Sequence, residues 1–246
     1  MRDFEYEAPS SLSDAVAVLS RHQGTARCLA GGTDLIDHIR TGRVAVDHVV
    51  DIKKIPELNV LELSAAGLRI GAAVPCARIY ENEEIARQYS ALVDSCHIIG
   101  GVQIQSRATL GGNLCNSGPA ADTTPSLIAL GGVCVIAGPQ GQREVPVESF
   151  CTAPGKNVLQ PGELLVAVKF PLRPAHSGSH YRRFIPRNEM DIAVVGVGAS
   201  VELDASGTKF LSARVALAAV AATPLFVPEI GQALAGQPVA DATYAK

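Results

Sequence analysis

Two short glycine-containing segments carry residue types that can bind an anion. The first, residues 30–35, reads Ala-Gly-Gly-Thr-Asp-Leu and precedes an apolar, helix-like stretch. Consecutive glycines permit a tight turn with positive φ and let backbone N–H groups approach a phosphate. Thr33 adds a hydroxyl donor, and Asp34 can cap the helix or meet a ribose hydroxyl. A purely structural, capped glycine turn explains this segment as well, so it decides nothing alone.

The second segment, residues 109–122, is polar and almost uncharged until its last residue, Asp122. It offers backbone donors at Gly111 and Gly112, side-chain amides at Asn113 and Asn116, and hydroxyls at Thr109 and Ser117. Such neutral, donor-rich loops suit a diphosphate whose charge is met by oriented amides. A solvated surface loop is an equal alternative for this segment in isolation, but two such segments in one chain favour a dinucleotide.

Other catalytic and metal-binding patterns are missing. There is no GxGxxG turn between strand and helix, no P-loop lysine and no GxSxG elbow. His176 and His180 fall in an expected linker, and His22, His38, His48 and His97 are scattered and assigned structural roles. Cys115 lies in the donor-rich segment without a base nearby in sequence, which favours a packing role. The sequence therefore predicts no catalytic side chain and no metal site.

Composition restricts the class of protein. The 246 residues are 47% hydrophobic and 18% charged, as in ordinary globular proteins, and the net charge of -3 provides no basic field for nucleic acid. The six cysteines form no CxxC pair, so we expect reduced thiols and neither zinc nor iron–sulfur ligation. Neither a signal peptide nor an apolar span is recognisable, which predicts a cytoplasmic protein.

The glycine segments must be positioned by the elements around them. A capping box at residues 11–14 predicts a helix to about residue 21, followed by strands at 26–30 and 46–52 around a short helix that ends near Gly42. Beyond residue 61 the pattern predicts a strand at 68–72, a helix at 79–92, and strands at 133–137, 143–147 and 164–170. Residues 99–122 lack any regular period and are expected to form a functional loop.

A linker is predicted at residues 174–179, which are small and polar. Strands at 181–185, 192–203 and 213–220 and a helix at 227–234 should follow. One short helix leaves much of a three-stranded sheet exposed. We therefore expect either a partner on the exposed face of the sheet or a natural chain that continues past Lys246.

Together these residues resemble the flavin subunits of molybdenum hydroxylases, the family of xanthine dehydrogenase, carbon monoxide dehydrogenase and 4-hydroxybenzoyl-CoA reductase. The resemblance covers most of the chain. It rests on residues 30–35, on residues 109–113 with Asp122 nine positions later, and on Tyr181-Arg182-Arg183 followed by Arg187 and Asp191-Ile192-Ala193.

The resemblance implies an α+β fold: a PCMH-type FAD-binding domain over residues 1–175, with subdomains at about 1–55 and 56–175, and a smaller, incomplete CO-dehydrogenase-flavoprotein-like sheet domain over 176–246. FAD would be held between the two glycine segments. Arg183 occupies a position where some relatives carry lysine. The implied FAD-binding residues are Leu29, Ala30, Gly31, Gly32, Thr33, Asp34, Leu35, Ile99, Thr109, Leu110, Gly111, Gly112, Asn113, Asp122, Leu165 and Arg183.

The activity implied by the resemblance is electron relay. A large molybdopterin subunit would oxidise the substrate, a small [2Fe–2S] subunit would pass on the electrons, and FAD would deliver them to NAD+ or another acceptor. Nucleic acid and membrane are not expected partners. Two alternatives are a stand-alone FAD oxidase or reductase and a non-enzymatic nucleotide-binding scaffold. Valine at Gly32 or Gly111 is expected to remove the flavin while leaving the fold.

Overall fold

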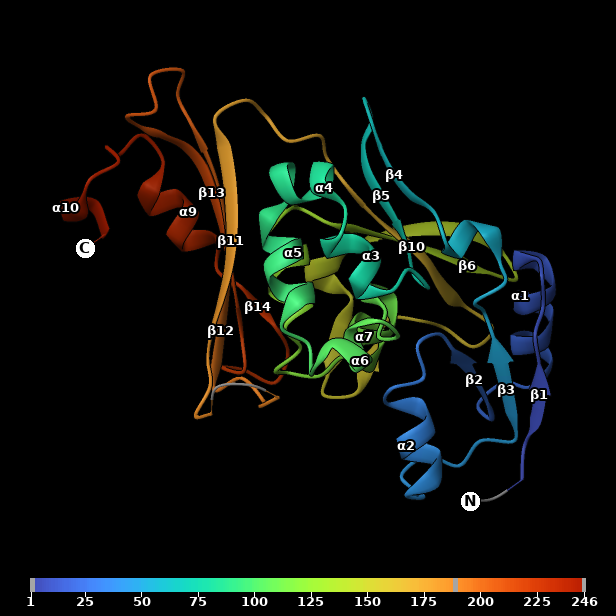
Figure 1. The fold of residues 1–246 in the computed structure, drawn as a ribbon. Coiled ribbons are helices and arrows are strands. Elements are labelled where there is room, and N and C mark those ends of the chain that lie inside the picture. The colour runs from blue at the N-terminus through green and yellow to red at the C-terminus, as the bar shows by residue number, and fades with distance from the viewer. Residues whose placement is uncertain (1–2, 188–189, 245–246) are drawn as a thin grey trace.

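The computed structural model describes residues 3–187 and 190–244. It contains a small parallel sheet at the N-terminus, a five-stranded antiparallel sheet with short helices, and a four-stranded C-terminal sheet (Figure 1). This is the α+β arrangement predicted from the sequence. No helix among the described residues is long and apolar enough to cross a membrane.

The N-terminal part is a three-stranded parallel sheet in the order β1-β3-β2. The Ser11 side chain caps the first helix by accepting from the Asp14 amide at 3.1 Å, and Val18 and Leu19 of that helix are buried against the sheet. The predicted capping box and strand–turn–helix–strand order are therefore confirmed. The elements are β1 (Glu5–Glu7), α1 (Leu12–Arg21), β2 (Ala26–Leu29), α2 (Leu35–Arg40) and β3 (His48–Asp51).

The central part is an antiparallel sheet in the order β4-β5-β10-β6-β7, with most of its helices inserted between β5 and β6. Its strands are β4 (Leu61–Ser64), β5 (Gly67–Gly71), β6 (Val133–Gly138), β7 (Gly141–Pro146) and β10 (Leu164–Phe170), with a separate hairpin of β8 (Cys151–Ala153) and β9 (Lys156–Asn157). Its helices are α3 (Cys76–Tyr80), α4 (Glu83–Gln88), α5 (Ser90–His97), α6 (Val102–Gln105), α7 (Leu110–Asn116) and α8 (Thr123–Ala129), with 3-10 turns η1 (Pro56–Leu58) and η2 (Val147–Ser149).

Two predictions for this part were wrong. The single helix expected at 79–92 is split into α3, α4 and α5, because Asn82 caps a new helix by accepting from the amides of Glu84 and Ile85. The segment 99–122, expected to be irregular, contains α6 and α7. Both helices are too short to show a helical period in the sequence.

The C-terminal part is a four-stranded antiparallel sheet in the order β11-β12-β13-β14. One face packs on α5 and α8 and the other on α9, so the sheet lies between helices (Figure 1). The expectation of a poorly covered three-stranded sheet was wrong, because β14 and α8 were not recognised in the sequence. The elements are β11 (Ser177–Phe184), β12 (Val195–Leu203), β13 (Phe210–Ala218), β14 (Leu225–Phe226), α9 (Pro228–Leu234) and α10 (Asp241–Tyr244).

Close packing joins this sheet to the rest of the chain. A Cβ at Gly198 of β12 would lie 2.5 Å from the Pro125 carbonyl carbon in α8. The predicted linker at 174–179 is shorter than expected because β11 already begins at Ser177, and His180 is not in a linker but on β11, where its ring nitrogen Nδ1 lies 2.5 Å from Asp94 of α5. The C-terminal sheet is therefore packed against α5 and α8, which precede and follow the second glycine segment along the chain.

Candidate functional site

A cavity of about 800 Å³ lies between the N-terminal and central parts, and both glycine segments line it. This volume falls within the range of pockets that hold drug-sized ligands and cofactors. The predicted residues that line it are Ala30, Gly31, Gly32, Thr33, Asp34, Leu35, Ile99, Thr109, Gly111, Gly112, Asn113 and Leu165. The fold thus brings together segments that are almost eighty positions apart in the sequence.

The first glycine segment provides hydrogen-bond donors without protein partners. Gly32 has a φ of +78°, so the turn uses the freedom predicted for it. Within the described part of the chain, the amides of Gly31, Gly32 and Thr33 donate no hydrogen bond, and the Thr33 hydroxyl has no partner. Unpaired backbone donors are costly unless water or a ligand meets them. The segment therefore presents hydrogen-bond donors to the cavity, where a ligand could accept from them.

Gly31 is required for a different reason, the close approach of two chain segments. A Cβ at this position would lie 2.1 Å from the Arg107 carbonyl oxygen, which belongs to the residues leading into the second glycine segment. The Arg107 Nε also donates to the Gly31 carbonyl at 3.3 Å. The first glycine segment is thus packed directly against the residues that precede the second glycine segment.

The second glycine segment is the N-terminus of α7 and not a loop. Thr109 caps this helix by accepting from the Gly112 amide at 3.0 Å. Gly111 also permits close packing: a Cβ there would lie 2.6 Å from the Ala72 carbonyl oxygen and 2.5 Å from the Ala72 Cβ. The prediction that valine at Gly111 would leave the fold was therefore wrong, because the substitution would push α7 away from the residue that follows β5.

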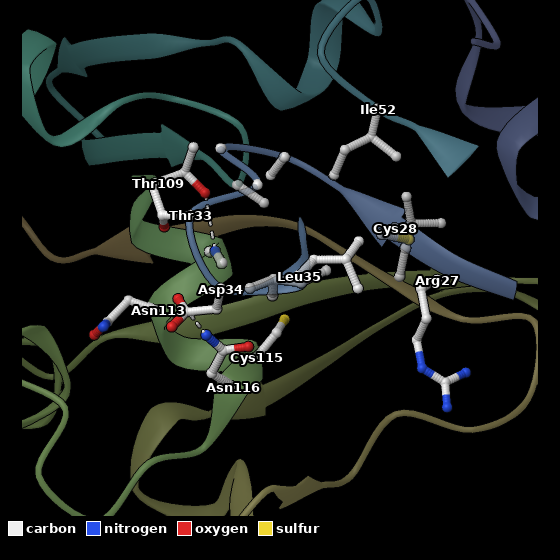
Figure 2. A pocket seen from close by; sticks show the side chains of 18 of the residues that line it. Arg27, Cys28, Thr33, Asp34, Leu35, Ile52, Thr109, Asn113, Cys115 and Asn116 are labelled. Carbon is white, nitrogen blue, oxygen red and sulfur yellow. Dashed lines mark hydrogen bonds between the residues drawn. The ribbon is translucent and has the colours of Figure 1, made fainter. Parts of the chain in front are cut away.

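Polar side chains join the two segments across the cavity. The Asn116 Nδ2 donates to the Asp34 Oδ2 at 2.8 Å, and this bond links α7 to the N-cap of α2. Figure 2 shows this bond, with Thr33, Thr109 and Asn113 around the same cavity. The Asn113 Oδ1 accepts from the Thr123 hydroxyl at 2.6 Å, which leaves its amide nitrogen for another partner.

Asn116→Ala is expected to weaken binding of FAD, the cofactor that the resemblance implies, about tenfold, which corresponds to about 1.4 kcal/mol. The substitution removes the hydrogen bond between Asn116 and Asp34 that links the two glycine segments. Hydrogen bonds to charged groups contribute about 1.5–3 kcal/mol, and we expect less from this one because it is exposed. The measurement is a fluorescence titration of flavin-free protein with FAD. Asn82→Ala, which removes a helix cap outside the cavity, serves as the control and should lower stability without changing FAD affinity.

Four predicted residues do not line the cavity. Leu29 and Leu110 are neighbours in the sequence of residues that line the cavity, and the Leu110 side chain is fully buried. Asp122 and Arg183 form an ion pair at 2.8 Å, with the two side chains only 13% and 8% exposed, and the Tyr181 hydroxyl donates to the other Asp122 oxygen at 2.8 Å. This ion pair links β11, which contains Arg183, to the start of α8, which Asp122 directly precedes.

The Asp122 cluster has unusual electrostatics. Burial raises the pKa of Asp122, although the hydrogen bonds from Tyr181 and Arg183 oppose the shift. Burial and the neighbouring carboxylate likewise raise the pKa of the Tyr181 hydroxyl. Arg183 also donates to the Ile98 carbonyl at 3.0 Å, so the cluster reaches the residue beside Ile99 in the cavity wall.

Sequence reasoning missed several residues of the cavity wall. Cys28 and Cys115 both line the cavity, and burial raises the pKa of the Cys28 thiol to about 12, so it is protonated and unreactive at neutral pH. All six cysteines are free thiols, as predicted. Arg27, Ile52, Gly155, Asn157 and Glu163 also line the cavity, whereas Asn116, another lining residue, was already named from the sequence as an amide donor. No local motif marks residues 155–163, because they reach the cavity only through the strand pairing of β8, β9 and β10.

Glu163 makes the stability of the cavity wall pH-dependent. Its carboxylate accepts two bonds of 2.7 Å from Arg143, which lower the pKa of Glu163 below the ordinary glutamate value of about 4.3. A depressed folded-state pKa contributes stability that is present above the unfolded value and is lost as the pH falls through the folded value. We expect the melting temperature of Glu163→Gln to vary less between pH 6 and 3 than that of the wild type, as measured by calorimetry; an identical pH profile would contradict this.

Comparison with known families identifies two matching regions. Residues 2–173 match the model of the FAD binding domain in molybdopterin dehydrogenase, and residues 180–246 match the CO dehydrogenase flavoprotein C-terminal domain. The chain is 36% identical over 228 residues to the xanthine dehydrogenase FAD-binding subunit of Escherichia coli O157:H7, covering 92% of this chain and 77% of that protein. It is 32% identical over 233 residues to the carbon monoxide dehydrogenase medium chain of Afipia carboxidovorans, covering 95% and 80%.

Solved structures agree with these matches. The fold superposes on a chain of the reconstituted CO dehydrogenase from Oligotropha carboxidovorans with a TM-score of 0.94 and 29% identity, covering 100% of this chain and 85% of that chain. It also superposes on quinoline 2-oxidoreductase from Pseudomonas putida 86 with a TM-score of 0.90 and 28% identity, covering 99% and 84%. The sequence and the fold thus point to one family.

Proposed function

Because the chain belongs to the FAD-binding subunits of the molybdenum hydroxylase family, we propose that it takes electrons from [2Fe–2S] clusters of a partner subunit and passes them through FAD to NAD+ or another acceptor. It is a subunit of an FAD-dependent oxidoreductase, in a family whose partner subunits carry the molybdenum cofactor and the iron–sulfur clusters. FAD supplies the redox chemistry, while the protein positions and tunes it.

The observation that carries this proposal is the pair of glycine segments facing one cavity with unpaired donors. The amides of residues 31–33 and the Thr33 hydroxyl would bind diphosphate oxygens, and the Asn113 amide would approach from the opposite side. Gly31 and Gly32 allow this arrangement because a Cβ at either would collide with neighbouring atoms. The donor set is neutral and fits a ligand that brings its own negative charge.

The FAD contacts are proposed to come from residues 30–35, Ile99, Thr109, residues 111–113 and Leu165, with Leu29 and Leu110 supporting them from behind. Asp122 and Arg183 are proposed to act on the site through the position of β11 and through Ile98, beside Ile99. We also propose a division into a FAD-binding domain at 1–175 and a C-terminal domain at 176–246, which is supported by the spans of the two family matches.

Purified protein is expected to carry one FAD per chain, detected by its visible absorbance and by the nucleotide released on heating. Protein that contains no flavin and binds none from added FAD would overturn the proposal. Reduction of the bound flavin by NADH without other proteins would support NAD+ as the acceptor, whereas reduction only through the [2Fe–2S] partner would favour another acceptor. Isolation of the chain in a complex with both partner subunits would separate the relay from a stand-alone oxidase.

A further inference from the structure

A group of three metal-ligating side chains lies outside the FAD cavity. Glu7, His22 and His48 place one ligand atom each within 4.8 Å of the others, and all three residues are partly buried. None of them lines the cavity described above. The two histidines are 26 positions apart in the sequence and were assigned separate structural roles, so only the tertiary structure reveals the group.

Three elements of the N-terminal part converge to form this group. In the parallel ladder His48 of β3 stands opposite Glu5 of β1, so Glu7, two residues further along β1, is on the same face of the sheet as His48. His22 is the C-cap residue of α1, and its carbonyl accepts from the Ala26 amide at 2.9 Å, which anchors it above the start of β2. The backbone therefore fixes all three positions.

One histidine of the group has a buried ring nitrogen without a partner. The His48 Nδ1 is buried and makes no hydrogen bond within the described part of the chain. A buried polar atom without a partner is unfavourable, so each one in a native structure needs an explanation such as an unseen ion. The His22 and His48 rings are stacked, with centroids 3.4 Å apart and planes inclined at 24°. Imidazoles bound to one tetrahedral ion have ring centroids about 5 Å apart, so the two rings must swing apart when an ion binds between them.

From these observations we infer that Glu7, His22 and His48 bind a divalent transition-metal ion of the Zn2+ type. Two imidazoles and one carboxylate are a known zinc ligand set, with the fourth position left to water. Bonds of about 2.1 Å in a tetrahedron place ligand atoms about 3.4 Å apart, so the side chains must close by up to about 1.4 Å from their present separation. The C-terminal end of α1, whose partial charge is negative, lies at His22 and favours a cation.

The bound ion ties the edge strand β1 and the end of α1 to the central strand β3. Since β1 has a partner on only one side, the ion adds a second attachment for it. The ion should therefore stabilise the part of the chain that carries the first glycine segment.

The test is Zn2+ binding to the flavin-loaded protein after treatment with a chelator, by equilibrium dialysis with metal analysis and by thermal unfolding. We expect one Zn2+ per chain and a higher melting temperature with Zn2+, but no such effect of Mg2+, which prefers oxygen ligands. His22→Gln and Glu7→Gln should each weaken binding about 100-fold or more. His176→Asn is the matched control and should bind Zn2+ like the wild type; its backbone φ of +58° is one that asparagine tolerates.

Two results would overturn the inference: no stoichiometric Zn2+ on the wild type, or equal Zn2+ binding by His22→Gln and the wild type. His22 follows α1 in a loop, so this variant should keep its flavin, and its visible absorbance verifies that it is folded. Equal stabilisation by Mg2+ and Zn2+ would contradict the proposed class of ion.

Discussion

Gly32→Val is expected to abolish FAD retention while most of the fold remains. Gly32 has a φ of +78°, which costs a residue with a side chain about 1–2 kcal/mol, and more when it is β-branched. The new Cβ would also lie 2.9 Å from the Leu29 Cδ1 and 3.3 Å from the Ile36 Cγ1. Both contacts are with side-chain atoms, so the turn can relax. The backbone donors of residues 31–33 would then no longer converge on the FAD diphosphate. Flavin content per chain, read from visible absorbance, is the measurement.

The control separates backbone strain from damage to the cavity. Gly207 has a similar φ of +70° and an added Cβ there meets nothing within 4 Å. It lies between β12 and β13, in the C-terminal sheet. Gly207→Val should therefore lose a comparable amount of stability and keep its flavin. If Gly32→Val retains flavin as well as Gly207→Val does, residues 31–33 do not bind the diphosphate.

Arg183→Met is expected to lower the free energy of unfolding by about 3–5 kcal/mol, because it leaves the buried Asp122 carboxylate without its cation. The double variant Asp122→Asn/Arg183→Met should recover much of this loss, since no buried charge remains. Chemical unfolding of the flavin-saturated proteins measures both. Lys169→Met breaks the exposed Glu144 pair and should cost no more than about 1 kcal/mol.

The loss in Arg183→Met should depend on pH. Burial already raises the pKa of Asp122, and removal of the neighbouring guanidinium should raise it further. A group with a raised folded-state pKa stabilises the protein at low pH, and this contribution is lost as the pH rises through that pKa. The defect should therefore be largest at pH 8 and shrink as the solution becomes acidic. A defect that is independent of pH, or a double variant as unstable as Arg183→Met, would mean that the carboxylate is not the cause.

Local signals in the sequence predicted the parts of the fold that short-range physics decides. The capping box at Ser11 and the apolar spacing after it fix α1, and the short apolar runs at residues 133–137 and 164–170, bounded by Gly and Pro turns, mark two strands of the central sheet. Short elements escaped prediction. Each of α3, α4 and α7 is at most seven residues long, so capping side chains and tertiary packing set its limits instead of a period.

The sequence by itself determined the two glycine segments, their donor chemistry and, through them, the family and its FAD. Residue type and spacing decide these because an anion nest is built within a few consecutive residues. Only the tertiary structure decided what each glycine does: Gly32 supplies a positive φ, whereas Gly31 and Gly111 permit contact with Arg107 and Ala72. It alone also brought together Glu7, His22 and His48, and Asp122 and Arg183. Such contacts depend on the register of strands and the docking of helices, which no local pattern encodes.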